Sequence, residues 1–113
     1  MANTPTLIRA YRGQPGITDT LLYTCPANTR VRILAATACN EGTTTRWFSM
    51  HMVTTGGAAA DSNLALNQKA LTSRASYVVN EIIGHILEPG DFLSSIAEAA
   101  AEITLHISAV AIA

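Results

Sequence analysis

Short apolar segments with a two-residue period recur along almost the whole chain, and this feature constrains the fold more than any other. Between residues 21 and 112 these segments are separated by Gly, Pro, Asn and Asp, which favour turns. No long segment places its apolar residues at the 3.6-residue spacing of an amphipathic helix. The pattern therefore predicts an all-β protein whose strands have alternating faces.

About eight strands are expected, at the spacing typical of an antiparallel sandwich or barrel. The predicted strands cover residues 21–24, 30–39, 46–54, 64–71, 76–83, 92–101 and 103–112, and residues 7–11 are a candidate first strand. Two segments are ambiguous, because 64–71 also fits a helical turn and the alanine-rich end of 92–101 has high helix propensity. Strand is favoured in both because their neighbours are strands, and a tight alanine-rich hairpin connection then leads to the last strand.

Side-chain alternation predicts which residues share a face in the clearest strands. One face of 30–39 carries Val31, Ile33, Ala35, Thr37 and Cys39; the core face of 46–54 carries Phe48, Met50 and Met52; in the last strand Ile103, Leu105 and Ile107 alternate with polar residues. Residues 88–91 have Pro and Gly at the central positions of a type II turn.

The chain has 113 residues, the usual size of one domain. We predict a single antiparallel β-sandwich, jelly-roll-like, over residues 21–113, with residues 1–20 as an extended N-terminal arm. The local sequence leaves two alternatives open for the arm: a first strand, or an extension that orders only against a partner.

Hydrophobic residues make up 49% of the chain and charged residues 13%, about half the usual charged share of a soluble domain. So much uncharged surface predicts contacts with neighbouring molecules. The net charge is −1 and the seven Lys and Arg residues are not clustered, so no nucleic-acid partner is expected. Because no apolar stretch approaches the ~20 residues of a membrane span and the N-terminus lacks a signal-peptide pattern, neither a membrane partner nor classical export is expected.

Opposite charges are unevenly placed along the chain. Residues 1–40 hold four arginines against one acid, Asp19, whereas residues 75–113 hold five acids and no Lys or Arg. The arginines are Arg9, Arg12, Arg30 and Arg32, and the acids are Glu81, Glu88, Asp91, Glu98 and Glu102. Two explanations are open: pairing within one fold, or a basic arm that reaches an acidic face of a neighbouring subunit.

No arrangement of residues predicts catalysis. Cys25 and Cys39 belong to no nucleophile motif, no zinc spacing is present, and Gly56-Gly57 is not followed by a phosphate-binding sequence. Both cysteines are expected to be reduced, with a disulfide as the alternative. The sequence thus predicts that the protein is not an enzyme and uses no cofactor, metal or small-molecule substrate.

Two further binding possibilities stay open at this point. His51 and His106 would approach closely enough to bind a metal if their strands were neighbours, and a trimer axis would gather three copies of one histidine; solvated or interface histidines are the simpler explanation. Trp47 and Tyr77 would stack on sugar rings, although aromatic residues make up only 5% of the chain.

Several motifs resemble a pattern found in small tailed-phage virion proteins. One is the sequence LYTCPA at residues 22–27, which precedes an apolar strand that ends in Cys39-Asn40. The others are residues 48–57, which read as a strand into a Gly-Gly loop, the turn at 87–91 and the closing strand at 103–112. The resemblance extends over residues 20–113 and rests on short structural motifs.

The resemblance implies a structural virion protein. Similar modules occur as capsid decoration (cement) proteins and as parts of tail or fibre proteins, and one compact sandwich with an arm favours the decoration role. The implied protein is a homotrimer on the capsid surface, made in the host cytoplasm, with the major capsid protein as its partner. The expected contact residues, toward capsid subunits or a neighbouring copy, are Leu7, Ile8, Arg9, Tyr11 and Arg12. The alternative is a tail or tail-fibre-associated structural or host-binding module.

Overall fold

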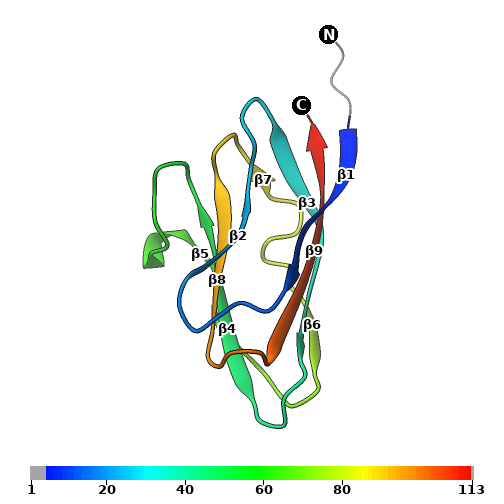
Figure 1. Ribbon diagram of the computed structural model, residues 1–113, viewed down its shortest axis with the longest axis vertical. Coiled ribbons are helices and arrows are strands. Elements are labelled where there is room, and N and C mark those ends of the chain that lie inside the picture. The colour runs from blue at the N-terminus through cyan, green and yellow to red at the C-terminus, as the bar shows by residue number, and fades with distance from the viewer. Residues whose placement is uncertain (1–4, 113) are drawn as a thin grey trace.

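Nine β-strands and one short 3₁₀ helix make up residues 5–112, the part of the chain that the computed structural model describes (Figure 1). The strands are β1 (Pro5–Gly13), β2 (Thr20–Thr24), β3 (Arg30–Asn40), β4 (Arg46–Val53), β5 (Leu64–Leu71), β6 (Ser76–Val78), β7 (Ile86–Leu87), β8 (Phe92–Ala97) and β9 (Ile103–Ile112). The 3₁₀ helix η1 (Asp61–Asn63) lies between β4 and β5. Within these residues, no helix is long and apolar enough to cross a membrane.

The strands form two antiparallel sheets that pack face to face (Figure 1). The β1 sheet has the order β1-β9-β3-β6, with β7 also paired to β3, and the β2 sheet has the order β2-β8-β4-β5. The pairs are therefore nested: β1 with β9, β2 with β8, β3 with β6 and β7, and β4 with β5. Nested pairing across two sheets is the jelly-roll arrangement, so the predicted jelly-roll-like all-β sandwich is confirmed.

Of the two ambiguous segments, one is a strand throughout and the other only in its first part. Residues 64–71 form β5 at the edge of the β2 sheet, and residues 92–97 form β8 between β2 and β4. The strand predicted over 92–101 therefore ends at Ala97, and the alanine-rich residues 98–102 form the turn that leads to β9. The strand predicted over 76–83 is shorter in the structure. β6 ends at Val78, and the chain then turns through Gly84, at φ 88°, before β7.

The inner faces of the two sheets enclose one apolar core. Phe48 and Met50 of β4 have no exposed surface, as predicted, while Met52 is half-buried and packs against them. The alternation predicted for β9 is confirmed, since its residues 103, 105 and 107 are buried. The largest fully buried side chains are Phe48, Ile33, Met50, Ile82, Leu87, Leu93, Ile103, Leu105, Ile107, Val31, Val53 and Val79.

The face predicted for β3 is correct only in its first half. The buried residues of this strand are Val31, Ile33, Ala36, Ala38 and Asn40. Ala35 and Thr37, predicted to share a face with Ile33, are exposed. The register with β9 shifts between Ile33 and Ala35, and the extra residue of this β-bulge reverses the alternation beyond it. The bulge lies in a run of apolar residues, so the sequence pattern does not reveal it.

Strand β1 occupies most of the segment expected as an N-terminal arm. It pairs with β9 from Pro5 opposite Ile112 to Gly13 opposite Leu105. Of the two alternatives for residues 1–20, the structure therefore has a first strand over Pro5–Gly13; residues 1–4 and 113 lie outside the described part. The domain boundary between residues 20 and 21 stays a prediction.

The first prediction concerns the core. Leu105→Ala should lower the free energy of unfolding by about 2–5 kcal/mol, because the lost methyl groups leave a cavity between the sheets. Leu7→Ala is the matched control: its side chain is 79% exposed, so the change should stay within about 0.5 kcal/mol. Equilibrium unfolding in guanidinium chloride measures both, and equal losses would contradict this assignment of faces.

The second prediction concerns the turn between β7 and β8. Gly90 has φ 89° and Asp91 N–H donates to the Glu88 carbonyl over 2.9 Å, as expected for the predicted type II turn. A Cβ at Gly90 would overlap the Thr55 side chain, whereas one at Gly56, at φ 80°, meets nothing within 4 Å. Gly90→Ala should therefore lower the melting temperature more than Gly56→Ala, which carries the backbone strain alone, about 1–3 kcal/mol. Equal shifts would show that the Thr55 contact costs nothing.

Candidate functional site

The outer face of the β1 sheet carries exposed arginines beside exposed aliphatic side chains. Leu7 of β1 and Arg32 of β3 both lie opposite Val110 of β9, and Ile86 of β7 extends this row across the sheet. Leu7 is 79% exposed and Ile86 is 56% exposed. We define the arginine face as Leu7, Arg9, Arg12, Arg30, Arg32 and Ile86. It combines charged and aliphatic side chains that are exposed to solvent.

One arginine of this face has an acidic partner. Arg30 Nε lies 2.7 Å from Glu88 Oε2, and both side chains are more than half exposed. The other ion pairs among residues 5–112 join Arg46 to Glu98 and Glu102, at the opposite end of the sandwich from Arg30. Pairing within the fold thus accounts for Arg30 alone among the four arginines of the N-terminal third, and the face keeps a positive charge.

The five residues expected to contact a partner divide between two environments. Leu7, Arg9 and Arg12 are exposed on the arginine face. Ile8 and Tyr11 are half-buried and pack against the core. A register shift between Arg9 and Tyr11 allows residues 9 and 12 to lie on the same face although they are three apart. Their contact role stays a prediction.

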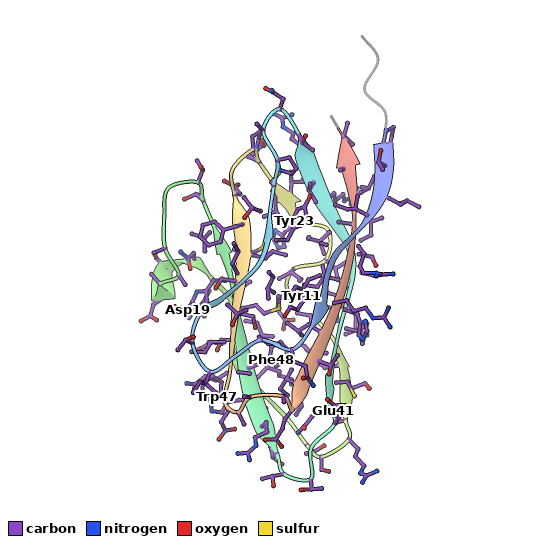
Figure 2. All side chains as sticks on the ribbon, viewed as in Figure 1. Tyr11, Asp19, Tyr23, Glu41, Trp47 and Phe48 are labelled. Atoms are coloured by element: carbon purple, nitrogen blue, oxygen red, sulfur yellow. The ribbon has the colours of Figure 1, made fainter. Side chains whose placement is uncertain are left out.

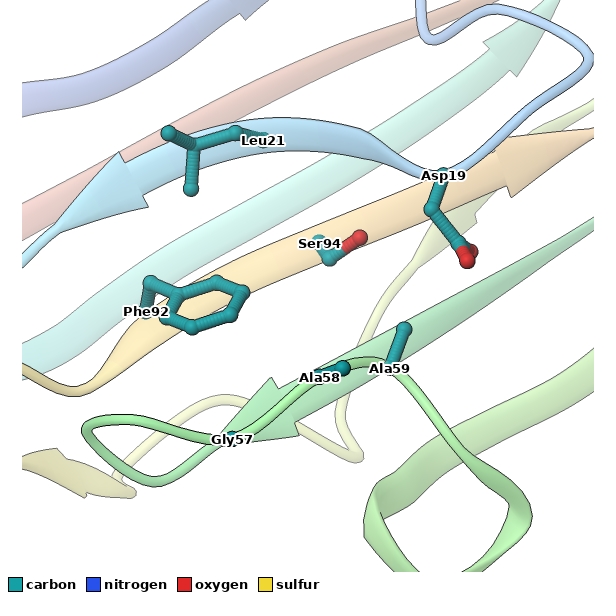
Figure 3. Close-up of a pocket in the computed structure, with 7 residues that line it drawn as sticks. All are labelled: Asp19, Leu21, Gly57, Ala58, Ala59, Phe92 and Ser94. Atoms are coloured by element: carbon teal, nitrogen blue, oxygen red, sulfur yellow. The ribbon is translucent and has the colours of Figure 1, made fainter.

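A hollow lies on the other side of the molecule, on the outer face of the β2 sheet (Figure 3). Its volume is about 280 Å³ and it is open to solvent. The lining residues are Asp19, Leu21, Gly57, Ala58, Ala59, Phe92 and Ser94. Figure 3 shows Phe92 and Ser94 of β8 between two walls, with Asp19 and Leu21 on one side and residues 57–59 on the other. We call it the Asp19 hollow; its walls are mainly apolar, and Asp19 supplies its carboxylate.

Residues 57–59, which form one wall of the hollow, belong to the connection between β4 and β5. Hydrogen bonds hold this connection in place. Asn63 Nδ2 donates to the Ala58 carbonyl over 2.8 Å, and its Oδ1 accepts from Ala60 N–H over 3.0 Å. The buried His51 Nδ1 lies 2.8 Å from Asn63 Oδ1. Thr55 N–H donates to Asp91 Oδ1 over 3.0 Å, which ties the same connection to the turn before β8. His51 therefore has a structural role in shaping the hollow.

The metal and sugar possibilities have no geometric support. His51 lies on β4 and His106 on β9, which belong to different sheets, so the two strands are not neighbours. No cluster of His, Cys, Asp or Glu within residues 5–112 has the arrangement of a metal site. Trp47 and Tyr77 also lie in different sheets, and the Tyr77 ring packs against the core, so they form no common platform.

Both cysteines are free thiols, as expected. Cys25 is buried, and its Sγ lies 3.1 Å from the Thr29 carbonyl oxygen. Burial raises the pKa of this thiol, with a smaller contribution from the carboxylates of Asp91 and Glu88. A buried thiol that holds its proton is a weak nucleophile, which fits a structural residue.

The Asp19 hollow was not found from the sequence. It combines three segments, around residues 19–21, 57–59 and 92–94, that lie far apart in the chain. The sequence indicated only a loop at Gly56-Gly57. The order of β2 and β8 in the sheet, which brings Leu21 opposite Ser94, is the information that was missing.

The third prediction concerns alkaline pH. The pKa of Tyr77 is raised above 10, first by its hydrogen bond to Glu81, and burial raises the pKa values of Tyr11 and Tyr23. These groups and Cys25 hold their protons more tightly when folded, so the unfolded chain ionises first as pH rises. Their stabilisation is complete below about pH 9 and is lost progressively above it. The melting temperature, measured by circular dichroism, should therefore fall between about pH 9 and 11.

Two variants separate the contribution of the tyrosine beside Glu81. Tyr77→Phe removes the ionising group, and Glu81→Gln removes the carboxylate that raises the pKa of Tyr77. In both, the alkaline fall in melting temperature should be smaller than in the original protein. A fall of the same size in all three proteins would contradict the coupling between these side chains.

No protein-family model and no curated protein matches this sequence. Among solved structures, the fold is similar to part of a chain in the structure of infectious bursal disease virus, Gx strain, with a TM-score of 0.54 and 13% sequence identity. The match covers 99% of this chain and 33% of the viral chain, so the protein spans about a third of that chain's length. A likeness at this identity establishes a shared β-sandwich fold.

Proposed function

We propose that this protein is a structural component of a virion, and specifically a capsid decoration protein that binds the assembled head and stabilises it. The observation that carries the proposal is the jelly-roll sandwich. Its fold matches part of a viral chain, and the match covers 99% of the residues of the present protein. The exposed arginine face supports the proposal, because a protein that acts by binding another protein needs apolar and charged side chains exposed on its surface. The resemblance of several short sequence motifs to small tailed-phage virion proteins is the reason for proposing a tailed-phage particle.

The proposed mechanism is mass action. A protein that binds the assembled shell and not its separate subunits stabilises the shell by the free energy of binding at each site. No chemical step is required, which agrees with a role that is not enzymatic. The proposed partners are the major capsid protein and further copies of this chain, assembled as a homotrimer on the capsid surface.

The proposed contact surface begins at β1. Leu7, Arg9 and Arg12 are exposed along this edge strand and provide the direct contacts to a capsid subunit or a neighbouring copy. Ile8 and Tyr11 face the core, so in the proposal they anchor β1 to the sandwich. An edge strand with unpaired backbone groups is also a place where a neighbouring chain can add to the sheet.

The fourth prediction is the position of the protein in a cryo-EM map of particles that carry it. Density on the shell at threefold or quasi-threefold positions is the expected result. Density confined to the tail would overturn the decoration role and favour a tail or tail-fibre-associated module. Density at neither place would overturn the virion role altogether.

A binding experiment complements the map. Heads that lack the protein should withstand heating better after the purified protein is added. The variant Arg9→Glu/Arg12→Glu should lose this effect, because both changes reverse charge on the arginine face. Arg74→Glu, an exposed arginine in the turn after β5, is the matched control and should act as the original protein. Equal protection by all three proteins would contradict a contact through β1.

A further inference from the structure

We propose that the Asp19 hollow is a docking site for a second copy of this chain, whose arginine face inserts an arginine side chain against the Asp19 carboxylate. The inference rests on the proposed function, since it names the neighbouring copy as the partner of the surface proposed there. It adds a second contact surface, on the opposite side of the sandwich.

The chemistry of the hollow fits one long cationic side chain. Asp19 takes part in none of the ion pairs among residues 5–112, so its carboxylate is available to a partner. The walls around it are apolar, from Leu21, Phe92 and the alanines of the loop. Arginine matches both features, because its methylene stem packs on apolar surface, its guanidinium stacks on an aromatic ring and its fork pairs with a carboxylate.

The shape of the hollow suits a side chain that projects from another protein. Its volume is about 280 Å³. It is open on one side, as a surface must be to receive a residue that projects from another protein. Leu21, which lines the hollow, is 60% exposed and supplies apolar contact area.

The arginine face carries the positive charge and the exposed aliphatic side chains that complement the hollow. Arg9, Arg12 and Arg32 are exposed and have no acidic partner among the described residues. The exposed aliphatic residues beside them, Leu7 and Ile86, match the apolar border of the hollow. One copy therefore offers positive charge with aliphatic side chains, and the next offers a carboxylate with aliphatic side chains. Such complementarity selects a second copy over a nucleic acid, whose phosphates would leave the aliphatic residues without partners.

The two surfaces lie on opposite sides of the sandwich, so the contact is heterologous. Figure 2 shows Asp19 beside the β2 sheet, across the molecule from the ribbon of β1, the strand to which Arg9 and Arg12 belong. A heterologous contact uses one surface of each copy and leaves the other available. Repetition then gives a closed ring, such as a trimer, when the rotation between copies closes, and an open chain when it does not.

The fifth prediction tests this contact by analytical ultracentrifugation of two variants. Asp19→Arg destroys the hollow's charge and leaves the arginine face intact. Arg9→Gln/Arg12→Gln/Arg32→Gln removes three positive charges from the arginine face and leaves the hollow intact. The original protein should self-associate, more weakly at high salt, and each variant alone should associate at least about tenfold more weakly. An equimolar mixture should form a complex of two chains, because each variant supplies the surface that the other has lost.

Matched variants control for general charge effects. Asp61→Arg changes an exposed acid in η1, outside the hollow, and Arg74→Gln changes an exposed arginine off the arginine face. Both should associate as the original protein does, and all variants should keep its melting temperature because the residues are exposed. The proposal is overturned if the original protein stays monomeric at every concentration, if the two variants still associate alone, or if their mixture stays monomeric.

Failure of this inference is distinguishable from failure of the proposed function. Density for separate copies on the shell, together with a monomer in solution, would overturn the docking of a second copy and leave the decoration role standing. Density on the tail would overturn the decoration role, whatever the ultracentrifugation shows.

Discussion

The packing of the two inner sheet faces against each other is the interaction on which the rest of the structure depends. Phe48 and Met50 from the β2 sheet meet Ile33 and Leu105 from the β1 sheet in the core, and each fully buried side chain of this size contributes about 1.5–3 kcal/mol. Because β1 pairs with β9, Pro5 lies beside Ile112 at the two ends of the described chain. Side chains on the outer faces are then free to contact other molecules.

The two outer faces differ because different constraints act on them. On the β1 sheet, the arginine side chains are exposed to solvent. The β2 sheet is partly covered by the connection between β4 and β5, which Asn63 and His51 hold close to the strands. Ser49 and Ser94 of this sheet are buried, and the Asp19 hollow lies beside the connection. Positive side chains thus lie on the outer face of the β1 sheet, and the Asp19 carboxylate lies at the outer face of the β2 sheet.

Much of the fold could be predicted because burial and strand geometry leave a local trace in the sequence. The alternation in β9 and the turn at Gly90 follow from the two-residue period and from glycine's tolerance of positive φ. The bulge between Ile33 and Ala35 left no such trace, since several apolar residues in a row fit either face. The register shift between Arg9 and Tyr11 in β1 left no trace either. The sequence therefore could not tell that Ile8 and Tyr11 face inward while Arg9 and Arg12 face solvent.

The sequence by itself determined the all-β class, the approximate strands and the shortage of catalytic residues, because each of these depends on residues close together in the chain. Only the tertiary structure decided that residues 5–13 complete a sheet, that four arginines share one exposed face, and that Asp19, Leu21 and Phe92 meet. Those features depend on which strands lie side by side. Strand order is set by the free energy of the whole core, to which distant segments contribute together.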